Sequence, residues 1–350
     1  MVHITLPGAD IERRLVFYLA MEEYVAAHLD SLLEGHDDKK AFFLWQVKPT
    51  VIFGRNQVME AEVNMPYCRE KGIRLFRRKS GGGCVYSDSG NIMLSYITSS
   101  TDVTSTFSDY LETLSGYLRA SGINAEKSGR NDILVDGRKV SGNAFFLKPK
   151  SSIVHGTMLF DSDFDELEKA ITPSATKIRS KGVSSVRQHV TNLKPLYEEA
   201  GSRLADISVF KKYLVDCFCG IRDRDGIVTG VDTVELTDAQ VAEIEAIEAG
   251  YLDPAFLEGR NHAYSACHSG KIPEVGEIAV ELDIDNGVIR RCHVSGDFFP
   301  LKDGLDELLT TRLAGVADEY CPLAAALKGT DLTPYVTGLY VADLLRIMDA

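Results

Sequence analysis

The chain has 350 residues, of which 45% are hydrophobic and 25% are charged, and its formal net charge is −13. These values are typical of a globular protein long enough to form two domains. The acidic balance argues against nucleic acid as the main partner, because phosphate binding needs a basic surface. No stretch approaches the roughly 20 apolar residues of a membrane span, and residues 1–10 lack the features of a signal peptide. We therefore expect a cytoplasmic protein that binds neither nucleic acid nor membranes.

The cysteines support this expectation. There are seven of them, at positions 68, 84, 217, 219, 267, 292 and 321. They form no CxxC pair and show no metal-ligand spacing. An odd, scattered set in a chain of this size indicates reduced thiols in a reducing compartment.

The first half of the chain alternates between predicted helices and strands. Apolar residues at helical spacing predict an amphipathic helix over 11–33, and a second helix is expected at 104–121. Strands are expected at 42–45, 50–53, 73–77, 84–86, 91–97, 131–135, 139–146 and 153–160. A turn is expected between the first two strands, and 84–86 and 91–97 are expected to form a return strand pair across a turn at 88–90.

The second half predicts a change of architecture after Tyr251. Helices are expected at 163–171, 205–220 and 237–250, and residues 173–182 have the character of a basic surface loop. Residues 252–273 are irregular and predict a linker. The segments 277–282 and 288–294 alternate around Asp285-Asn286-Gly287, a strong hairpin signal, and helices are expected at 303–315 and 335–349. The predicted fold class is therefore α/β (α+β), with a mixed-sheet domain over 1–255 and a small α+β domain over 260–350.

Residues 77–83 read Arg-Arg-Lys-Ser-Gly-Gly-Gly and form the first candidate site. Three consecutive glycines permit positive φ and close backbone approach, so that successive N–H groups can converge on an anion. Arg77 and Arg78 add charge and bidentate hydrogen bonding to phosphate or carboxylate oxygens. The segment is not a Walker loop, because GxxxxGK[ST] is absent. A flexible turn with solvated arginines is the alternative, and the presence of both arginines favours an anion site.

A second candidate combines Asp132 with Lys139. Asp132 is a candidate Mg²⁺ ligand, since this cation prefers oxygen ligands. Lys139 lies where a strand leaves a turn at 136–137, and Ser141 and Gly142 leave backbone room beside it. A lysine in this position can bridge a carboxylate and an α-phosphate and stabilise the charge that develops between them. The alternative is a surface lysine beside a β-turn, the more common position of a single lysine.

Two weaker candidates complete the set. His155-Gly156-Thr157 falls in a predicted strand, where a lone histidine is more often a structural residue than a catalytic one. The stretch 177–191 has an ordinary surface loop as its alternative interpretation. Neither feature identifies a function alone.

Together these motifs resemble the lipoate–protein ligase family, over most of the chain. The matching segments are 43–45, 54–57, 77–88 with 90–91, 128–132, 138–144, 155–157, 180–187 and 190–193. Ordered motifs at family spacing are far more specific than any one of them. Residues 287–299 resemble the accessory domain of many such ligases. The resemblance implies a mixed β-sheet catalytic domain of the biotin/lipoate ligase type with a small α+β C-terminal domain.

The resemblance also implies a two-step reaction. Lipoate and ATP would give lipoyl-adenylate and pyrophosphate, and a lysine of a lipoyl-acceptor domain would then take the acyl group. The acceptors would be lipoyl domains of 2-oxoacid dehydrogenase E2 subunits or the glycine cleavage H protein, and the enzyme is expected to be a monomer. Closure of a loop around 181–183 over the intermediate would protect the adenylate from hydrolysis. ATP and Mg²⁺ are the implied cofactors.

Site residues follow from the matching motifs. Lys139 is the expected catalytic residue, in contact with both lipoate and the adenylate. The residues expected to bind ATP are Arg78, Gly83, Cys84, Val85, Tyr86, Asn131, Asp132, Lys139, Lys181, Gly182 and Val183, with Asp132 also the candidate Mg²⁺ ligand. The residues expected to bind the acyl substrate are Ser80, Gly81, Gly82, Lys139, Ser141, Gly142, His155 and Gly156.

Particular residues argue against other activities of the same fold. A biotin ligase is disfavoured because the lipoate-type segment 180–192 is present. Octanoyl or lipoyl transferases work through a cysteine nucleophile, and no cysteine lies between Cys84 and Cys217. Cys84 itself is more simply a small buried residue. A non-catalytic lipoate-binding protein is a third alternative, and the presence of Lys139 argues against it.

Overall fold

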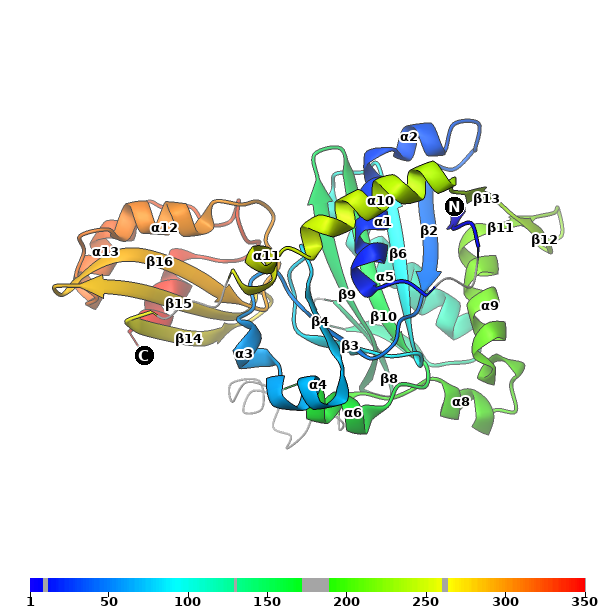
Figure 1. Ribbon diagram of the computed structural model, residues 1–350, viewed down its shortest axis with the longest axis horizontal. Helices are drawn as coiled ribbons and strands as arrows, with labels where there is room; N and C mark the ends of the chain where they lie inside the picture. The colour runs from blue at the N-terminus through cyan, green and yellow to red at the C-terminus, as the bar shows by residue number, and fades with distance from the viewer. Residues whose placement is uncertain (9–11, 129–130, 172–188, 260–263, 350) are drawn as a thin grey trace.

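The computed structural model describes residues 1–8, 12–128, 131–171, 189–259 and 264–349, which form a large body and a smaller C-terminal one (Figure 1). The strands of the large body are β1 (Val2–Thr5), β2 (Lys40–Trp45), β3 (Thr50–Phe53), β4 (Arg74–Arg77), β5 (Val85–Ser87), β6 (Asn91–Thr98), β7 (Ala125–Ser128), β8 (Asp132–Val135), β9 (Arg138–Lys148), β10 (Ser151–Leu159), β11 (Gly220–Arg222), β12 (Val228–Val231) and β13 (Thr233–Glu235). Its helices are α1 (Leu15–Ala27), α2 (Leu29–Leu32), α3 (Met59–Glu62), α4 (Met65–Lys71), α5 (Val103–Ala120), α6 (Phe164–Ala170), α8 (Lys194–Glu199), α9 (Ile207–Cys219), α10 (Asp238–Tyr251) and α11 (Pro254–Glu258), with a 3₁₀ turn at Arg203–Ala205.

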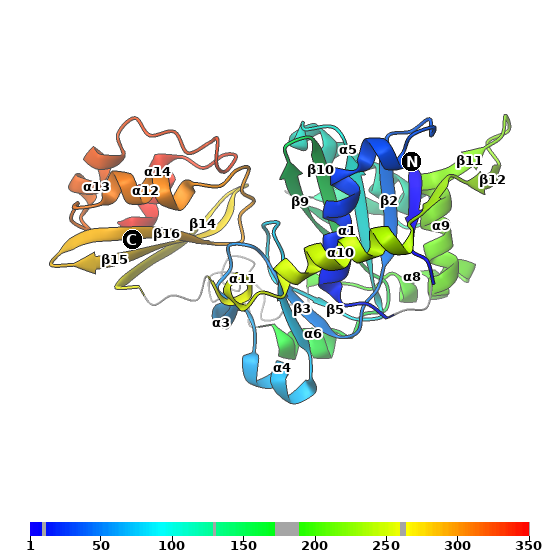
Figure 2. The ribbon, with the colours of Figure 1, turned by 45° about the horizontal axis from the view of Figure 1, so that its top comes forward.

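A mixed sheet forms the frame of the large body. Among the described residues its order is β13-β1-β2-β6-β10-β9-β8-β7. Successive side chains of a strand point to opposite faces, and both faces here are buried: Phe42 packs in one hydrophobic cluster and Phe43 in the other. Helices α1 and α10 lie side by side across one face, and α5 and α9 cover the other (Figure 2). The sheet is thus the middle layer of three.

A smaller sheet, β4-β3-β5, stands beside the large one, and it corrects one expected pairing. β2 and β3, predicted as two strands with a turn between them, are both present and enter different sheets. The expected pairing of 84–86 with 91–97 is wrong, because β5 pairs with β3 while β6 pairs with β2 and β10. All eight residues of β6 are buried, and its two edges are already filled. The Gly-rich segment, residues 78–84, connects β4 to β5 within this smaller sheet.

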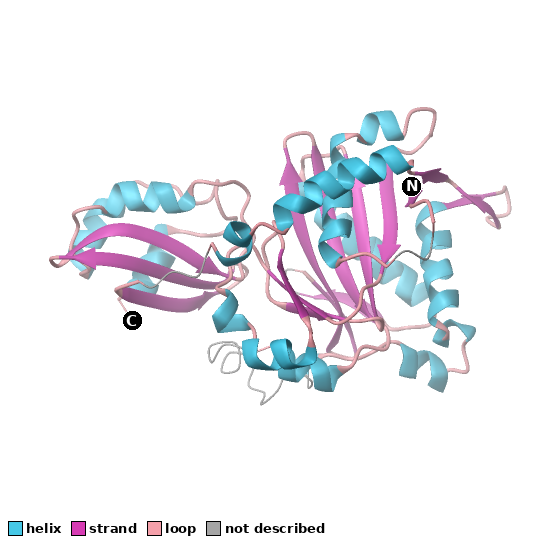
Figure 3. Ribbon diagram, viewed as in Figure 1, coloured by secondary structure: helices cyan, strands magenta, loops and turns pink. Residues whose placement is uncertain are grey.

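The C-terminal body has its own hydrophobic cluster, built around the antiparallel sheet β14-β15-β16 (Figure 3). Its elements are β14 (Ala266–Ile272), β15 (Gly276–Asp285), β16 (Val288–Gly296), α12 (Leu305–Leu313), α13 (Tyr320–Leu327) and α14 (Val341–Met348). The predicted hairpin is confirmed, with Asn286 and Gly287 at φ of 53° and 80°. The predicted linker over 252–273 is partly wrong, since α11 and β14 fall within it. β14 is an edge strand with exposed alternate residues, so its sequence carries little apolar signal.

The two bodies meet at the Gly-rich segment. Gly82 N donates to Phe298 O over 3.2 Å, and Gly296 N donates to Asn56 O over 2.9 Å. Arg55 and Asp303 form an ion pair at 2.7 Å. A Cβ on Gly81 would lie 2.2 Å from Phe298 O, so only glycine permits this approach. The small body therefore forms part of the environment of the candidate site.

None of the helices within the described ranges is long and apolar enough to span a lipid bilayer.

Candidate active site

A cavity of about 480 Å³ lies between the two sheets and the small body. Its wall includes Arg78, Gly82, Gly83, Cys84, Val85, Tyr86, Asn131, Asp132, Lys139, Gly142, His155 and Gly156, all of which the sequence predicted as site residues. These residues are contributed by the Gly-rich segment and by β5, β8, β9 and β10. The fold thus gathers motifs that lie up to some eighty positions apart around one space.

Three predicted substrate-binding residues lie behind the wall. Ser80 Oγ hydrogen bonds with Arg78 and His155. Gly81 packs against the small body, and Ser141 Oγ accepts from Asn143 Nδ2 over 3.0 Å. The structure does not bring them to the cavity surface, so any effect on a ligand would be transmitted through these neighbours. Lys181, Gly182 and Val183 lie outside the described residues.

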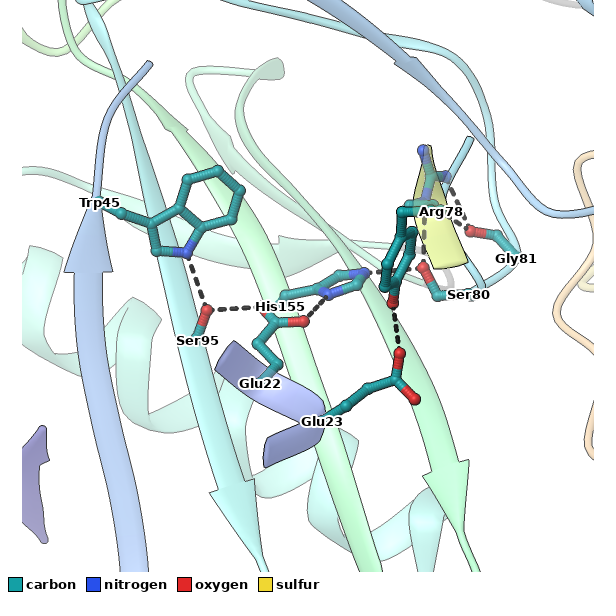
Figure 4. Close-up of polar contacts among 9 residues, drawn as sticks. Glu22, Glu23, Trp45, Arg78, Ser80, Gly81, Ser95 and His155 are labelled. Carbon is teal, nitrogen blue, oxygen red and sulfur yellow. Dashed lines mark hydrogen bonds and ion pairs between the residues drawn. The ribbon is translucent and has the colours of Figure 1, made fainter. Parts of the chain in front are cut away.

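Arg78 organises the Gly-rich segment from inside. Its Nη2 donates to the carbonyl of Gly81 over 2.7 Å, and its Nε donates to Ser80 Oγ over 3.1 Å (Figure 4). Nη2 also donates to the carbonyl of Gly83 over 2.8 Å. Burial lowers the pKa of the guanidinium to about 10, so the group remains charged at neutral pH. A Cβ on Gly54 would lie 2.0 Å from Gly82 O. The segment is therefore held in one shape by its own arginine and by β3.

Arg77 has a different role from the one its position beside Arg78 suggested. Its side chain is 1% exposed, and its guanidinium does not face the cavity. It donates to the carbonyls of Gly54, Arg55, Gln57, Phe256 and Leu257. Only one of the two adjacent arginines thus reaches the cavity wall, while the other ties α11 to the segment after β3.

Lys139 and Asp132 form an ion pair at the cavity wall, with 2.7 Å between Nζ and Oδ1. The turn before Lys139 is the predicted one, with Asp136 and Gly137 at positive φ. Leu134 pairs with Lys139 and Ile133 with Ser141, which makes Val140 an additional residue on β9. Such a bulge redirects side chains, and the Lys139 side chain lies over Gly142, where a Cβ would be 2.5 Å from Nζ. The arrangement presents a partly exposed cation with room for an anion.

Several wall residues were missed by the sequence analysis. The small body contributes Lys271, Glu277 and Asp297, and the large body contributes an apolar group of Leu19, Ile52 and Met93. None belongs to a motif with recognisable chemistry. Their placement depends on contacts between elements distant in the chain, and the only local signal was the apolar face of the predicted first helix.

Two consecutive carboxylates of α1, Glu22 and Glu23, were also missed and are 2% and 7% exposed. Glu23 receives hydrogen bonds from Lys79 Nζ, Lys148 Nζ and Tyr251 OH over 2.6, 2.8 and 2.7 Å. Burial raises the pKa of Glu23, but the bonds from Lys148, Lys79 and Tyr251 more than offset this, and the net pKa lies below 4.5. The ionised carboxylate therefore links α1 with β9 and the end of α10.

Glu23→Gln is expected to lower the free energy of unfolding by about 2 kcal/mol at pH 7, since charged hydrogen bonds to a carboxylate are lost. Because the folded-state pKa is depressed, this contribution is complete above the unfolded value of about 4.5 and is lost as pH falls through the folded pKa. Urea denaturation at pH 7, 5 and 3.5 measures it. A difference between wild type and variant that does not shrink towards pH 3.5 would contradict the charge-based account.

The comparisons with known proteins agree with the motifs. The lipoyl protein ligase A/B catalytic domain family matches residues 15–219, and the bacterial lipoate protein ligase C-terminus family matches residues 261–348. Lipoate-protein ligase LplJ of Bacillus subtilis (strain 168) is 34% identical over 333 residues, covering 94% of this chain and 95% of that protein. Lipoate–protein ligase 1 of Staphylococcus aureus (strain Mu50) is 33% identical with the same coverage.

Solved structures confirm the predicted fold class. The crystal structure of P. falciparum LipL1 in complex with lipoate has a TM-score of 0.69 at 19% identity, covering 99% of this chain and 98% of that one. A bi-partite lipoate protein ligase from Thermoplasma acidophilum has a TM-score of 0.58 at 23% identity, covering 76% and 98%. Lipoate-protein ligase A bound with ATP has a TM-score of 0.58 at 24% identity, covering 74% and 99%. These similarities concern the fold alone. The family matches and the relatives at 33–34% identity over 94% of the chain establish that it belongs to the lipoate–protein ligase family.

Proposed function

We propose that this chain is an ATP-dependent lipoate–protein ligase. It activates lipoate to lipoyl-adenylate, releasing pyrophosphate, and transfers the lipoyl group to a lysine of an acceptor domain. The observation that carries the proposal is the Lys139–Asp132 pair at the wall of a cavity that also holds the Gly-rich segment and an apolar end. The similar structures support it, since one is described in complex with lipoate and another as bound with ATP.

The first chemical step needs charge stabilisation at the α-phosphate. A lipoate carboxylate oxygen attacks the α-phosphorus of ATP, and pyrophosphate leaves. Lys139 lines the cavity, and in the proposed reaction its ammonium would contact both the carboxylate and the α-phosphate and stabilise negative charge as it develops. The apolar group of Leu19, Ile52 and Met93 would hold the acyl chain, and Arg78 with residues 83–86 would face the nucleotide.

The second step consumes the adenylate. The neutral amine of an acceptor lysine attacks the acyl carbonyl carbon, AMP leaves, and an amide is formed. The acceptors expected from the family are lipoyl domains of 2-oxoacid dehydrogenase E2 subunits or the glycine cleavage H protein. The archaeal neighbour supports the first class, because it is described together with its E2 lipoyl domain.

A magnesium ion would be held through Asp132. The donor set is one partly exposed carboxylate at the cavity wall, and Mg²⁺ commonly uses one or two carboxylates together with substrate phosphates and waters. Within the described ranges there is no cluster of three or more metal-ligating side chains, which suits an ion that arrives with the nucleotide rather than a resident one. When bound, the ion would neutralise phosphate charge.

Two organisational proposals accompany the activity. We infer domains over 1–255 and 260–350, a division supported by the separate hydrophobic cluster of the small body. We also propose a cytoplasmic monomer, a compartment supported by the odd, scattered set of seven cysteines in the sequence.

The test is a pyrophosphate-release assay with lipoate and ATP, followed by mass spectrometry of an added lipoyl domain. We expect pyrophosphate release only when lipoate and ATP are both present, and a mass increase of one lipoyl group on the acceptor domain. Lipoate binding without pyrophosphate release would replace the proposal with that of a non-catalytic lipoate-binding protein.

The cysteine-dependent alternative is tested by Cys84→Ala. Cys84 lines the cavity, so a transferase would have to use this thiol. We expect a loss of activity smaller than about threefold, because the adenylate route needs no thiol nucleophile. Complete loss, together with an acyl adduct found on Cys84 of the wild-type protein, would support the transferase instead.

A further inference from the structure

A buried chain of hydrogen bonds runs from α1 to the Gly-rich segment (Figure 4). Glu22 Oε2 lies 2.8 Å from His155 Nδ1, and His155 Nε2 lies 2.7 Å from Ser80 Oγ. Ser80 Oγ accepts from Arg78 Nε over 3.1 Å. Each of these four residues is at most 8% exposed. A charged group on a helix is thus connected through a histidine to the arginine that holds the segment.

The hydrogen bonds of this series are consistent with a single direction of donation, from Arg78 through Ser80 and His155 to Glu22. Arg78 Nε can only donate, so Ser80 Oγ is its acceptor. The Ser80 hydroxyl hydrogen is then available for His155 Nε2, which accepts it as the unprotonated nitrogen of a neutral ring. The ring proton therefore sits on Nδ1 and is donated to Glu22. Every donor between Arg78 and Glu22 finds an acceptor in this arrangement, as buried polar groups require.

At the other end of this hydrogen-bond series, contacts with β2 and β6 fix the carboxylate of Glu22. Glu22 Oε1 accepts from Ser95 Oγ, and Ser95 Oγ accepts from Trp45 Nε1 over 2.9 Å. Trp45 is itself stacked on Tyr18, with ring centroids 4.8 Å apart. The two oxygens of Glu22 therefore bind different partners: Oε1 accepts from Ser95 on β6, which is in turn bonded to Trp45 on β2, and Oε2 bonds with His155.

The order Ser80–His155–Glu22 has the connectivity of a nucleophile, a base and an orienting acid. Its surroundings argue against a nucleophilic role. Ser80 is 2% exposed, is absent from the cavity wall, and its oxygen already accepts from Arg78. A nucleophile needs an open path to the substrate, and this hydroxyl lacks one. The geometry suits support of the Gly-rich segment rather than acyl transfer.

We propose that Glu22 is a positioning residue, which fixes the His155 tautomer and thereby holds Ser80 and Arg78 in the conformation that shapes the Gly-rich segment. Its effect on activity rests on the proposed adenylation, in which this segment would face ATP. Loss of the acceptor would free the ring to place its proton on Nε2. Both Arg78 and His155 would then donate to Ser80, whose own hydroxyl hydrogen would lose its acceptor, and the contacts of Arg78 with Ser80 and with the carbonyls of Gly81 and Gly83 would be disturbed.

Two variants separate this role from simple packing. Glu22→Met keeps the length of the side chain but removes the acceptor, and we expect the KM for ATP to rise about tenfold with kcat changed less than about threefold. Glu22→Gln retains an oxygen for His155 Nδ1–H and should recover a KM within about threefold of the wild type. Tyr197→Phe is the control for stability, because it removes one part-buried hydrogen bond, to Ser121, that does not belong to the series from Arg78 to Glu22. The melting temperatures of all three are measured alongside.

The tautomer is measured directly, without reference to ligase activity. Long-range ¹H–¹⁵N NMR of the wild-type ring should show a neutral His155 protonated on Nδ1 at pH 7, and Glu22→Met should shift the proton towards Nε2. A wild-type ring protonated on Nε2 or on both nitrogens, or a Glu22→Met variant with wild-type KM, would overturn the proposal. Labelling of Ser80 by a serine-reactive fluorophosphonate would also overturn it, in favour of a nucleophile. Absence of pyrophosphate release in the wild type would contradict the proposed ligase function and leave the NMR result standing.

Discussion

Lys139→Ala is expected to lower lipoate-dependent pyrophosphate release by about two to three orders of magnitude, the usual cost of losing charge stabilisation at a reacting centre. The fold should survive, because the ion pair with Asp132 is partly exposed and such pairs contribute little, about 0–1 kcal/mol. The measurement is steady-state pyrophosphate release at saturating lipoate and ATP, with the melting temperature recorded for the same sample.

Lys194→Ala is a matched control for this experiment. Lys194 also forms an ion pair at 2.7 Å, with Asp161, and the exposed fractions of the two lysine side chains are 35% and 33%. Lys194 does not line the cavity, so its removal should leave the rate unchanged. Near-normal release from a folded Lys139→Ala protein would remove this lysine from the mechanism. An equal loss in both variants would indicate a general effect of charge or stability.

The features predicted from the sequence were those specified by neighbouring residues. Asp285-Asn286-Gly287 encodes its hairpin locally, because only residues tolerant of positive φ can make that turn. Lys139 was predicted for a similar reason, since the turn before it and Gly142 after it are encoded within a few positions. Strand partners are a non-local choice, and the pairing expected for β5 was wrong although both strands exist. Periodicity identifies a strand but not the sheet that it joins.

The site residues also divide into those that neighbouring residues specify and those that depend on elements distant in the sequence. Arg77 and Arg78 are adjacent and chemically identical, yet one meets backbone carbonyls of α11 and the other lines the cavity. Neighbouring residues at the end of a strand point in different directions. The local sequence does not show which of these two directions leads to the cavity. Glu22 and Asp297 were missed for a related reason. Glu22 gains its role from a contact with β10, which is distant in the sequence. Asp297 gains its role from the cavity, whose other wall residues come largely from the large body.

Arg77→Met is expected to destabilise the large body by about 3–5 kcal/mol, because several buried carbonyls lose a charged donor and each unsatisfied buried group costs about 1–3 kcal/mol. Arg77 is 1% exposed, and its guanidinium donates to five backbone carbonyls that join α11 to the segment after β3. Methionine fills part of the volume but donates no hydrogen bond, so these buried carbonyls lose a partner. A change of this size is a large part of the stability of a typical domain.

Urea denaturation followed by tryptophan fluorescence measures this change in the large body alone, because Trp45 is the only tryptophan of the chain and lies in the hydrophobic cluster beneath α1. Arg119→Met is the matched control. Arg119 donates to the backbone carbonyl of Ala125 and to the carboxylate of Glu112, but 45% of its side chain is exposed. Its loss should cost less than about 1 kcal/mol. If the two variants unfold at the same urea concentration, the carbonyl bonds of Arg77 contribute no more than a surface pair, and the link between α11 and the Gly-rich segment must be held by apolar packing instead.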